Sequence, residues 1–283
     1  MSRFWDLTLG GLSSGATFAA IALSLVLIWR ATRVVNFAQG GMAMITTFIG
    51  YEVIHRGGSY WLGFAVALAS GLVLGAVTER VLIRPVERKP PLNAVIVTLG
   101  LLILLEAVAG MVWGATPRSF PFAFDFRGAF SPSDTFAVAA VAGAALLLLV
   151  LFQATATGLR MRAAAFEPEV ARMLGVRVGR VLTLGWALAA VAGSLAGLLA
   201  APPFISPNGL DALLVFGFTA AVIGGLDSPI GAVLGGLVLG LALSYVSGYL
   251  GADVVAFGSL VILVAVLMVR PSGVFGRTGS RQV

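Results

Sequence analysis

The sequence predicts an all-α integral membrane protein, a polytopic helical bundle of about 8–9 spans with broken or re-entrant helices. Three observations lead to this prediction: the composition, the long apolar runs and the placement of basic residues. Hydrophobic residues make up 59% of the 283 residues, charged residues only 11%, and the mean hydropathy is +1.02. A soluble domain typically carries about 25% charged residues. This chain therefore has too few charges to cover a water-exposed surface.

Long apolar runs mark the expected spans, since a helix needs about 20 apolar residues to cross a bilayer. Seven runs are firm: Leu7–Trp29, Tyr60–Ile83, Asn93–Trp113, Thr135–Gln153, Val181–Ala201, Ile230–Leu250 and Val254–Val269. Two more segments, Asn36–Ile54 and Asp211–Leu226, are shorter or interrupted by glycine. We expect residues 1–283 to form a single transmembrane domain in which these two segments are short crossings or re-entrant.

The basic residues predict the orientation, because Lys and Arg accumulate in cytoplasmic loops. Most of the 18 fall in four segments: Arg30 and Arg33; Arg80, Arg84, Arg88 and Lys89; Arg160, Arg162, Arg172, Arg177 and Arg180; and Arg270, Arg277 and Arg281. Nine crossings, with the N-terminus outside and the tail 270–283 in the cytoplasm, would place all four segments inside. A re-entrant segment would change both the count and the N-terminal side. The net charge of +6 is thus a topology signal, and we expect no nucleic-acid partner.

Signals for chemistry are absent from the sequence. No GxxxxGK[ST] stretch is present, so we expect no ATP binding by that route. The chain has no cysteine and a single histidine, His55, and no acidic cluster resembles a metal site. We therefore expect no catalytic residue, no metal and no cofactor in this chain. These absences also argue against the alternative of an intramembrane enzyme, since the sequence shows no candidate active site for one.

Polar residues interrupt the apolar sequence at a first break, "NFAQGG", which contains Asn36, Gln39, Gly40 and Gly41. Apolar sequence resumes directly after it. Broken helices are tolerated in membranes only where the freed backbone groups face protein or a wet cavity. The break therefore indicates either a polar path through the bundle or hydrogen bonds between packed helices.

A second break lies in "AAVIGGLDSPIGAVLGGLVLG". Apolar sequence reaches Gly224 and Gly225, and Asp227, Ser228 and Pro229 then stop the helix. Pro229 suits a first helical position because its missing N–H would be unpaired there. Ser228 or Asp227 can cap the new helix. The pattern predicts helix, tight turn and helix.

The loop at residues 158–180 contains a short helix between two spans. Pro168 fits a first helical position, and Glu167 and Glu169 suit its positive end. Gly175 stands where helices commonly end in a left-handed residue. Val170, Met173 and Leu174 share one apolar face, and Arg172 lies off it. So short a helix needs support, either from its own bundle or from a partner whose groove takes the apolar face.

These motifs together resemble the permease subunits of ABC importers of the high-affinity branched-chain amino acid type. The resemblance rests on "NFAQGGMAM", "ERVLIRPVERKPPLNAVIVTLGLLILLE", "RAAAFEPEVARMLGV" and "AAVIGGLDSPIGAVLGGLVLG", in that order along the chain. It implies a second, related permease in a heterodimer, two cytosolic ATP-binding subunits that hold ATP and Mg, and an extracytoplasmic substrate-binding protein. It also implies a multi-pass protein of the bacterial cytoplasmic (inner) membrane, surrounded by lipid, with its C-terminus in the cytoplasm.

The same resemblance implies residue roles. The coupling helix that contacts the ATPases would be Glu167, Pro168, Glu169, Val170, Arg172, Met173 and Leu174. The translocation pathway would include Asn36, Gln39, Gly40, Gly41, Thr98, Glu106 and Thr219. Transport would proceed by alternating access, with an amino acid as substrate.

Glu106 departs from the family pattern, in which an amide is more usual. A carboxylate at membrane depth generally faces a cavity or a partner, so Glu106 would be neutral, pair with an arginine or contact a substrate amino group. The departure leaves urea, short amides and other amino acids as alternative substrates. A more distant alternative is a secondary transporter that couples uptake to an ion gradient.

Overall fold

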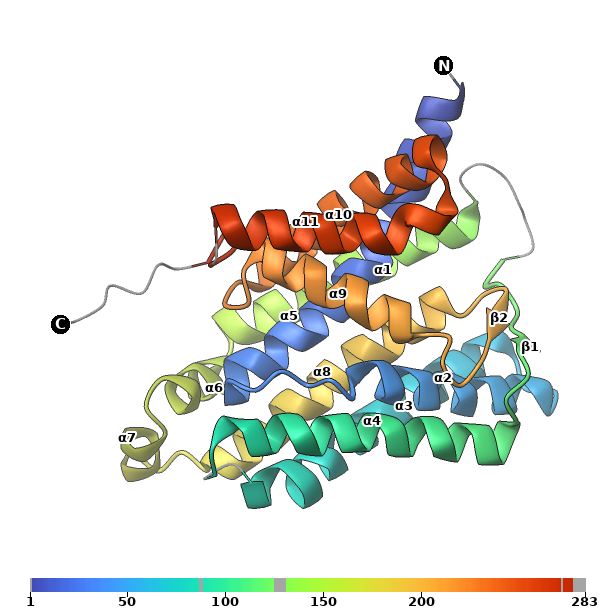
Figure 1. The fold of residues 1–283 in the computed structure, drawn as a ribbon. Helices are drawn as coiled ribbons and strands as arrows, with labels where there is room; N and C mark the ends of the chain where they lie inside the picture. Colours follow the sequence, from blue (N-terminus) through green and yellow to red (C-terminus); the bar gives the residue numbers. More distant parts are fainter. Residues whose placement is uncertain (1, 87–88, 125–130, 271, 277–283) are drawn as a thin grey trace.

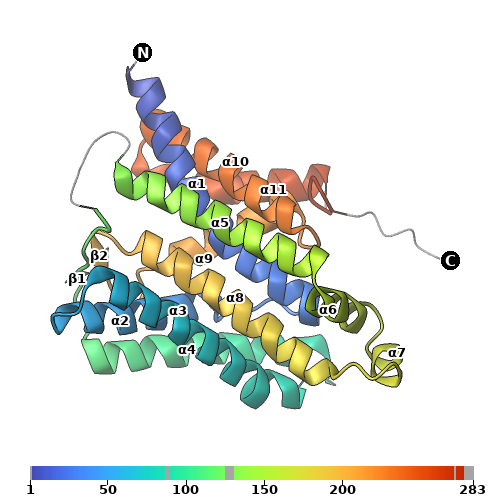
Figure 2. The same cartoon turned by 180° about the vertical axis from the view of Figure 1, so that it is seen from behind.

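The computed structural model describes residues 2–86, 89–124, 131–270 and 272–276 (Figures 1 and 2). The elements are α1 (Ser2–Thr32), α2 (Gln39–His55), α3 (Tyr60–Val77), η1 (Thr78–Ile83), η2 (Arg84–Val86), α4 (Pro91–Trp113), β1 (Arg118–Ser119), α5 (Pro132–Ala154), α6 (Ala156–Phe166), α7 (Pro168–Met173), α8 (Val178–Ala200), β2 (Phe204–Ile205), α9 (Asp211–Gly224), α10 (Pro229–Leu250), η3 (Ala252–Val254) and α11 (Val255–Val269).

Seven of the described helical segments are long and apolar enough to cross a membrane, and they coincide with the seven firm runs. The two weak segments form α2, with 17 residues, and α9, with 14. The all-α polytopic bundle is thereby confirmed, and the protein is a multi-pass membrane protein. The nine helices of these segments alternate in direction (Figures 1 and 2), the first beginning on the side of the bundle where β1 and β2 lie and the last ending on the side where α7 lies. We call these two ends of the bundle the β1–β2 end and the α7 end.

Several helices cross closely where one of the two carries two glycines spaced four residues apart. Small residues at this spacing let helices approach each other in lipid. In α10, Gly236 and Gly240 lie against α1, where a Cβ on Gly240 would be 2.2 Å from the Cα of Gly15. Gly71 and Gly75 of α3 lie equally close to α8. The glycines therefore set the distances between helices.

Burial divides the bundle into a core and a periphery. In α1 and α8, 78% and 72% of the most apolar window is buried, whereas α5 and α11 bury 17% and 6%. The helices α1 and α8 thus form the centre, and α5 and α11 present apolar side chains to the surroundings of the subunit. Such faces suit lipid or another membrane subunit.

The chain between α1 and α2 is extended and crosses the front of the bundle above α4 in Figure 1. It begins at Arg33, whose φ of 57° is left-handed, and α2 starts only at Gln39. Asn36–Ile54 is therefore an extended segment followed by a helix, which explains its weak span signal. At the β1–β2 end, Arg118 and Ser119 pair with Ile205 and Phe204 and join two distant loops.

Candidate functional site

The short helix α7 is held by local sequence signals. Pro168 is its first residue, and Glu167 occupies the N-cap position without making a side-chain cap. Gly175 has a φ of +80°, and the backbone N–H groups of Gly175 and Val176 bond the carbonyls of Arg172 and Ala171. This double closure is the common glycine-dependent helix ending. The described geometry agrees with the expected start and end of the helix.

One side of α7 is anchored and the other is open. Ala171 is buried against Ala164 of α6 and against Val178 and Leu182 of α8. On the open side four apolar side chains are exposed: Phe166 at 87%, Val170 at 44%, Met173 at 80% and Leu174 at 77%. We call these four residues the apolar knob. Figure 2 shows α7 projecting beyond the ends of the long helices.

Polar side chains of α7 lie beside the knob. Arg172 donates to Glu169 at 2.7 Å within the helix, an exposed pair that contributes little to stability. Exposed apolar side chains this concentrated generally mark an interaction surface. On the inner side, Ala171 connects α7 to α6 and α8 through one buried cluster.

The second break is a tight turn at the α7 end. The helix α9 ends at Gly224, Gly225 has a φ of +93°, and α10 begins at Pro229. The Ser228 hydroxyl accepts the backbone N–H of Gly231 at 2.9 Å and caps α10. Asp227 does not cap; it pairs with Arg33, at the end of α1.

The C-terminal segment closes this turn. The backbone N–H groups of Val274 and Phe275 donate to the carbonyls of Ile223 and Gly224 at 2.9 and 3.2 Å. Carbonyls at a helix end otherwise lack partners, so the segment completes α9. Residues 277–283 of the predicted tail lie outside the described part of the chain.

The two amide side chains of the first break, Asn36 and Gln39, are buried and hydrogen-bonded. The Asn36 amide donates to the Gln39 side-chain oxygen at 2.9 Å, and the Gln39 amide donates to the carbonyl of Ala189 at 3.1 Å. Gln39 lies on the backbone of α8, since a Cβ at Gly193 would be 2.1 Å from its amide nitrogen. These contacts join α2 to α8 inside the subunit. Asn36 and Gln39 therefore have a structural role in holding α2 to α8. Their role in a translocation pathway stays a prediction.

Four other predicted pathway residues lie on α2, α4 and α9. Gly40 and Gly41 contact Leu214 of α9 and Leu102 of α4. Thr98 bonds the carbonyl of Val95, and Thr219 bonds that of Val215, so both hydroxyls are satisfied within their own helices. These four are buried, as are Asn36 and Gln39.

Glu106 is the one predicted pathway residue with partial exposure. Its side chain lies beside that of Asp211, the first residue of α9, close enough for the carboxyl groups to interact. The side chain that interacts with Glu106 is thus an acid rather than an arginine. Asp211 was not among the predicted site residues, and its only signal in the sequence was a carboxylate at the start of the weak span Asp211–Leu226.

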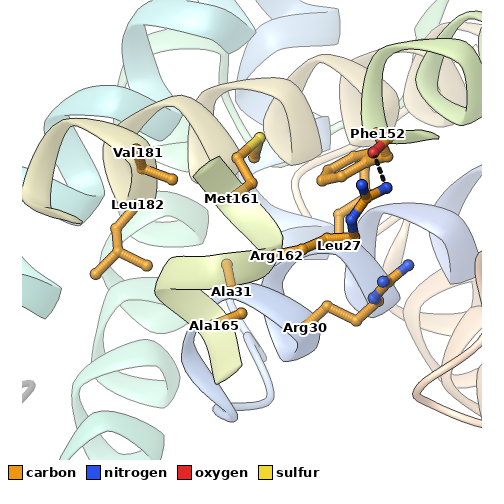
Figure 3. A pocket seen from close by; sticks show the side chains of 9 residues that line it. All are labelled: Leu27, Arg30, Ala31, Phe152, Met161, Arg162, Ala165, Val181 and Leu182. Atoms are coloured by element: carbon orange, nitrogen blue, oxygen red, sulfur yellow. Dashed lines mark hydrogen bonds between the residues drawn. The ribbon is translucent and has the colours of Figure 1, made fainter. Parts of the chain in front are cut away.

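Two of the cavities among the described residues differ in size and place. The smaller, of 30 Å³ (Figure 3), is lined by Leu27, Arg30, Ala31, Phe152, Met161, Arg162, Ala165, Val181 and Leu182. In it, Arg162 reaches from α6 to the carbonyl of Phe152 on α5. The larger, of 290 Å³, lies near the β1–β2 end beside Tyr60 and Asp134. No predicted pathway residue lines either cavity. The smaller holds only about two water molecules, and it marks where α6 is wedged against α1 and α8.

An apolar bundle with a buried polar break between two of its helices and an anchored amphipathic helix projecting from one end has the architecture of a membrane permease. The comparisons agree. The chain belongs to the family described as branched-chain amino acid transport system / permease component, whose model matches residues 7–269.

Individual relatives match along nearly the whole chain. The high-affinity branched-chain amino acid transport system permease protein LivH of Escherichia coli K12 is 31% identical, with 94% of each chain covered. BraD of Pseudomonas aeruginosa, described by the same phrase, is 30% identical with 94% of each chain covered. Among solved structures, PsaBC from Streptococcus pneumoniae superposes with a TM-score of 0.52 at 12% identity, covering 96% of this chain and 93% of that chain. At that identity the likeness concerns the fold alone.

Proposed function

We propose that this chain is the membrane-spanning permease subunit of an ATP-driven importer that moves branched-chain or related hydrophobic amino acids inward by alternating access. The observation that carries the proposal is the apolar knob on α7, together with the family to which the chain belongs. A permease that hydrolyses no ATP itself needs a contact through which an ATPase moves it. The knob is apolar, anchored on its inner side and open on its outer side.

ATP hydrolysis is assigned to partners. The chain lacks a Walker A stretch, and the family is one of transport subunits. Two cytosolic subunits would hold ATP and Mg, and their closure would pull α7, the coupling helix. Because Ala171 shares a buried cluster with Val178 and Leu182, the pull would pass into α8 and open the translocation pathway outward. No covalent step in this chain is required.

The remaining partners and the location follow from the same proposal. A second, related permease would complete a heterodimer, and an extracytoplasmic binding protein would deliver the substrate. In the bacterial inner membrane the α7 end would face the cytoplasm, because Arg30, Arg33, Arg84 and Arg162 lie there. The C-terminal segment, which closes the turn after α9, would then be cytoplasmic.

Glu106 and Asp211 supply the chemistry that would favour an amino acid over urea. The two carboxyl groups lie next to each other, that of Glu106 on α4 and that of Asp211 at the start of α9. A carboxylate there can accept hydrogen bonds from the ammonium group of an amino acid, and charged hydrogen bonds contribute about 1.5–3 kcal/mol. An amide such as urea carries no such charge.

Replacing Glu106 by glutamine is therefore expected to lower apparent substrate affinity in uptake about tenfold, because a charge-assisted contact becomes a neutral one. The measurement is uptake of labelled leucine, and separately of urea, by the complete importer in proteoliposomes. Glu52→Gln, which changes a carboxylate near the β1–β2 end that already pairs with Arg56, is the matched control. Leucine uptake that is unaffected by Glu106→Gln would remove this residue from the pathway.

The proposed function is tested by isolating the tagged chain from its native membranes in mild detergent and identifying the proteins that accompany it. Recovery of ATPase subunits and a second permease is expected. Recovery of the chain alone, in a preparation whose uptake follows an ion gradient, would contradict the proposal and establish the secondary transporter instead. Turnover of a substrate by the chain alone would establish an enzyme.

A further inference from the structure

A π-helical turn interrupts the end of the α3 segment. Residues Thr78–Ile83 form η1, and the backbone N–H of Arg84 donates to the carbonyl of Glu79, five residues earlier. In an α-helix of 3.6 residues per turn, side chains five positions apart point to different sides. The wider turn brings these two together: Arg84 Nε lies 3.1 Å from Glu79 Oε1, and Arg84 Nη2 lies 2.9 Å from Oε2. Such π-helical turns are rare in proteins, and those that do occur often lie at functional sites.

Glu79 is the only charged residue among the buried ones in the described part of the chain, with a side chain 1% exposed. Besides Arg84, the hydroxyl of Thr183 donates to its Oε2 at 2.6 Å. Arg84 Nη2 also donates to the carbonyl of Gly179 at 2.7 Å. Removing a carboxylate from water costs free energy that its pairing often does not recover. The ion pair alone therefore does not explain why Glu79 is buried. We call Glu79, Arg84, Gly179 and Thr183 the Glu79 cluster.

The cluster binds the same stretch of α8 that holds the coupling helix. Gly179 and Thr183 contact Arg84 and Glu79, while their neighbours Val178 and Leu182 contact Ala171 of α7. Two adjacent faces of the first turns of α8 are thus occupied, one by α7 and one by the end of the α3 segment. A side chain at Gly179 would crowd the guanidinium, since a Cβ there lies 3.3 Å from Arg84 Cζ.

Further along the same helix, α8 contacts the first break. Gly71 and Gly75 keep α3 against α8, and Gln39 bonds the carbonyl of Ala189. A movement of the first turns of α8 would therefore be shared by α3 and delivered to the start of α2. The cluster lies where this shared movement would begin.

We propose that Glu79 is a positioning residue for energy coupling: with Arg84 and Thr183 it locks the end of the α3 segment to α8, so that movement of α7 turns α3 and α8 as one body. The proposal rests on the proposed function, in which α7 receives the movement of an ATPase. Without the Glu79 charge, the bond from Thr183 weakens and Arg84 loses the carboxylate that orients it toward Gly179, so the end of the α3 segment follows α7 and α8 less closely.

The experiment uses Glu79→Gln, with Glu52→Gln as the matched carboxylate control at the other end of the bundle. In the complete importer in proteoliposomes, ATP hydrolysed per substrate transported is expected to rise at least about fivefold, the lower limit of typical coupling between sites. In the chain alone, the distance distribution between spin labels at Met173→Cys and Val73→Cys is expected to broaden. The chain has no native cysteine to interfere.

The outcomes separate the two proposals. A lower melting temperature with an unchanged ATP ratio and an unchanged label distribution would show a merely structural role and overturn the inference. If Glu79→Gln does not fold, Thr183→Val is the second variant, because it removes the hydroxyl bond to Glu79 and keeps the ion pair with Arg84. The ATP hydrolysed per substrate transported must then rise in the Thr183→Val importer, or the inference fails. If the unsubstituted chain shows no ATPase coupling, the proposed function fails, and the label distribution still reports whether Glu79 positions α7.

Discussion

Replacing Met173 and Leu174 together by aspartate is expected to weaken binding of the ATPase partners at least about 100-fold and to abolish uptake. The two side chains are 80% and 77% exposed in the subunit. Burying an apolar side chain of this size contributes about 1.5–3 kcal/mol, so losing two of them removes about 3 kcal/mol or more. Each 1.4 kcal/mol is a factor of about ten in affinity. The measurement is titration of the purified ATPase against detergent-solubilised chain.

Two comparisons make this result specific to the apolar knob. Phe204→Asp replaces an exposed aromatic side chain at the β1–β2 end by a charged one. This variant should leave ATPase binding unchanged. Met173→Ala with Leu174→Ala should give an intermediate loss, because less apolar area is removed and no charge is added. Full ATPase binding by the double aspartate variant would show that the ATPase docks elsewhere.

Replacing Gly240 by leucine is expected to lower the free energy of unfolding by about 3 kcal/mol or more, at the upper end of overpacking effects. A Cβ at Gly240 would lie 2.2 Å from the Cα and 2.4 Å from the nitrogen of Gly15, and backbone cannot move aside as a side chain can. The helices α1 and α10 must then separate, and α1 belongs to the buried centre. Tryptophan fluorescence during titration with a denaturing detergent measures the change.

Gly10→Leu is the control for the same pair of helices. Gly10 lies on α1 next to Gly11, yet no heavy atom comes within 4 Å of a Cβ placed on it. Its substitution should change stability little while adding the same apolar volume. Equal stabilities of the two variants would mean that α1 and α10 do not cross as closely as described.

Local signals account for the parts of the fold that the sequence analysis placed well. Apolar runs such as Thr135–Gln153 need no partner to be recognised, because the bilayer itself selects them by length. The helix α7 was expected between Pro168 and Gly175 for an equally local reason, since both its start and its end depend on residues within it. Glycines spaced four residues apart favour close crossings in lipid, but their spacing does not say which helices cross.

Long-range contacts account for what the sequence analysis missed. Whether Asn36 and Gln39 face a path or a helix depends on Ala189, which is 150 residues from Gln39 along the chain. Glu106 meets Asp211 only because α4 and α9 both flank the start of α2. The motif that contains Glu79 was noted only as part of a resemblance, because five-residue spacing on an ordinary helix would separate Glu79 from Arg84.

The sequence by itself determined that this is a multi-pass helical membrane protein, and it located the seven long spans, both breaks and the short amphipathic helix. Each of these depends on composition and spacing within one segment, and the bilayer makes such local rules strict. Only the tertiary structure decided that α1 and α8 form the centre, that the C-terminal segment completes α9, and that a buried carboxylate joins α3 to α8. These depend on which distant surfaces meet, and that is fixed by the packing of the whole bundle.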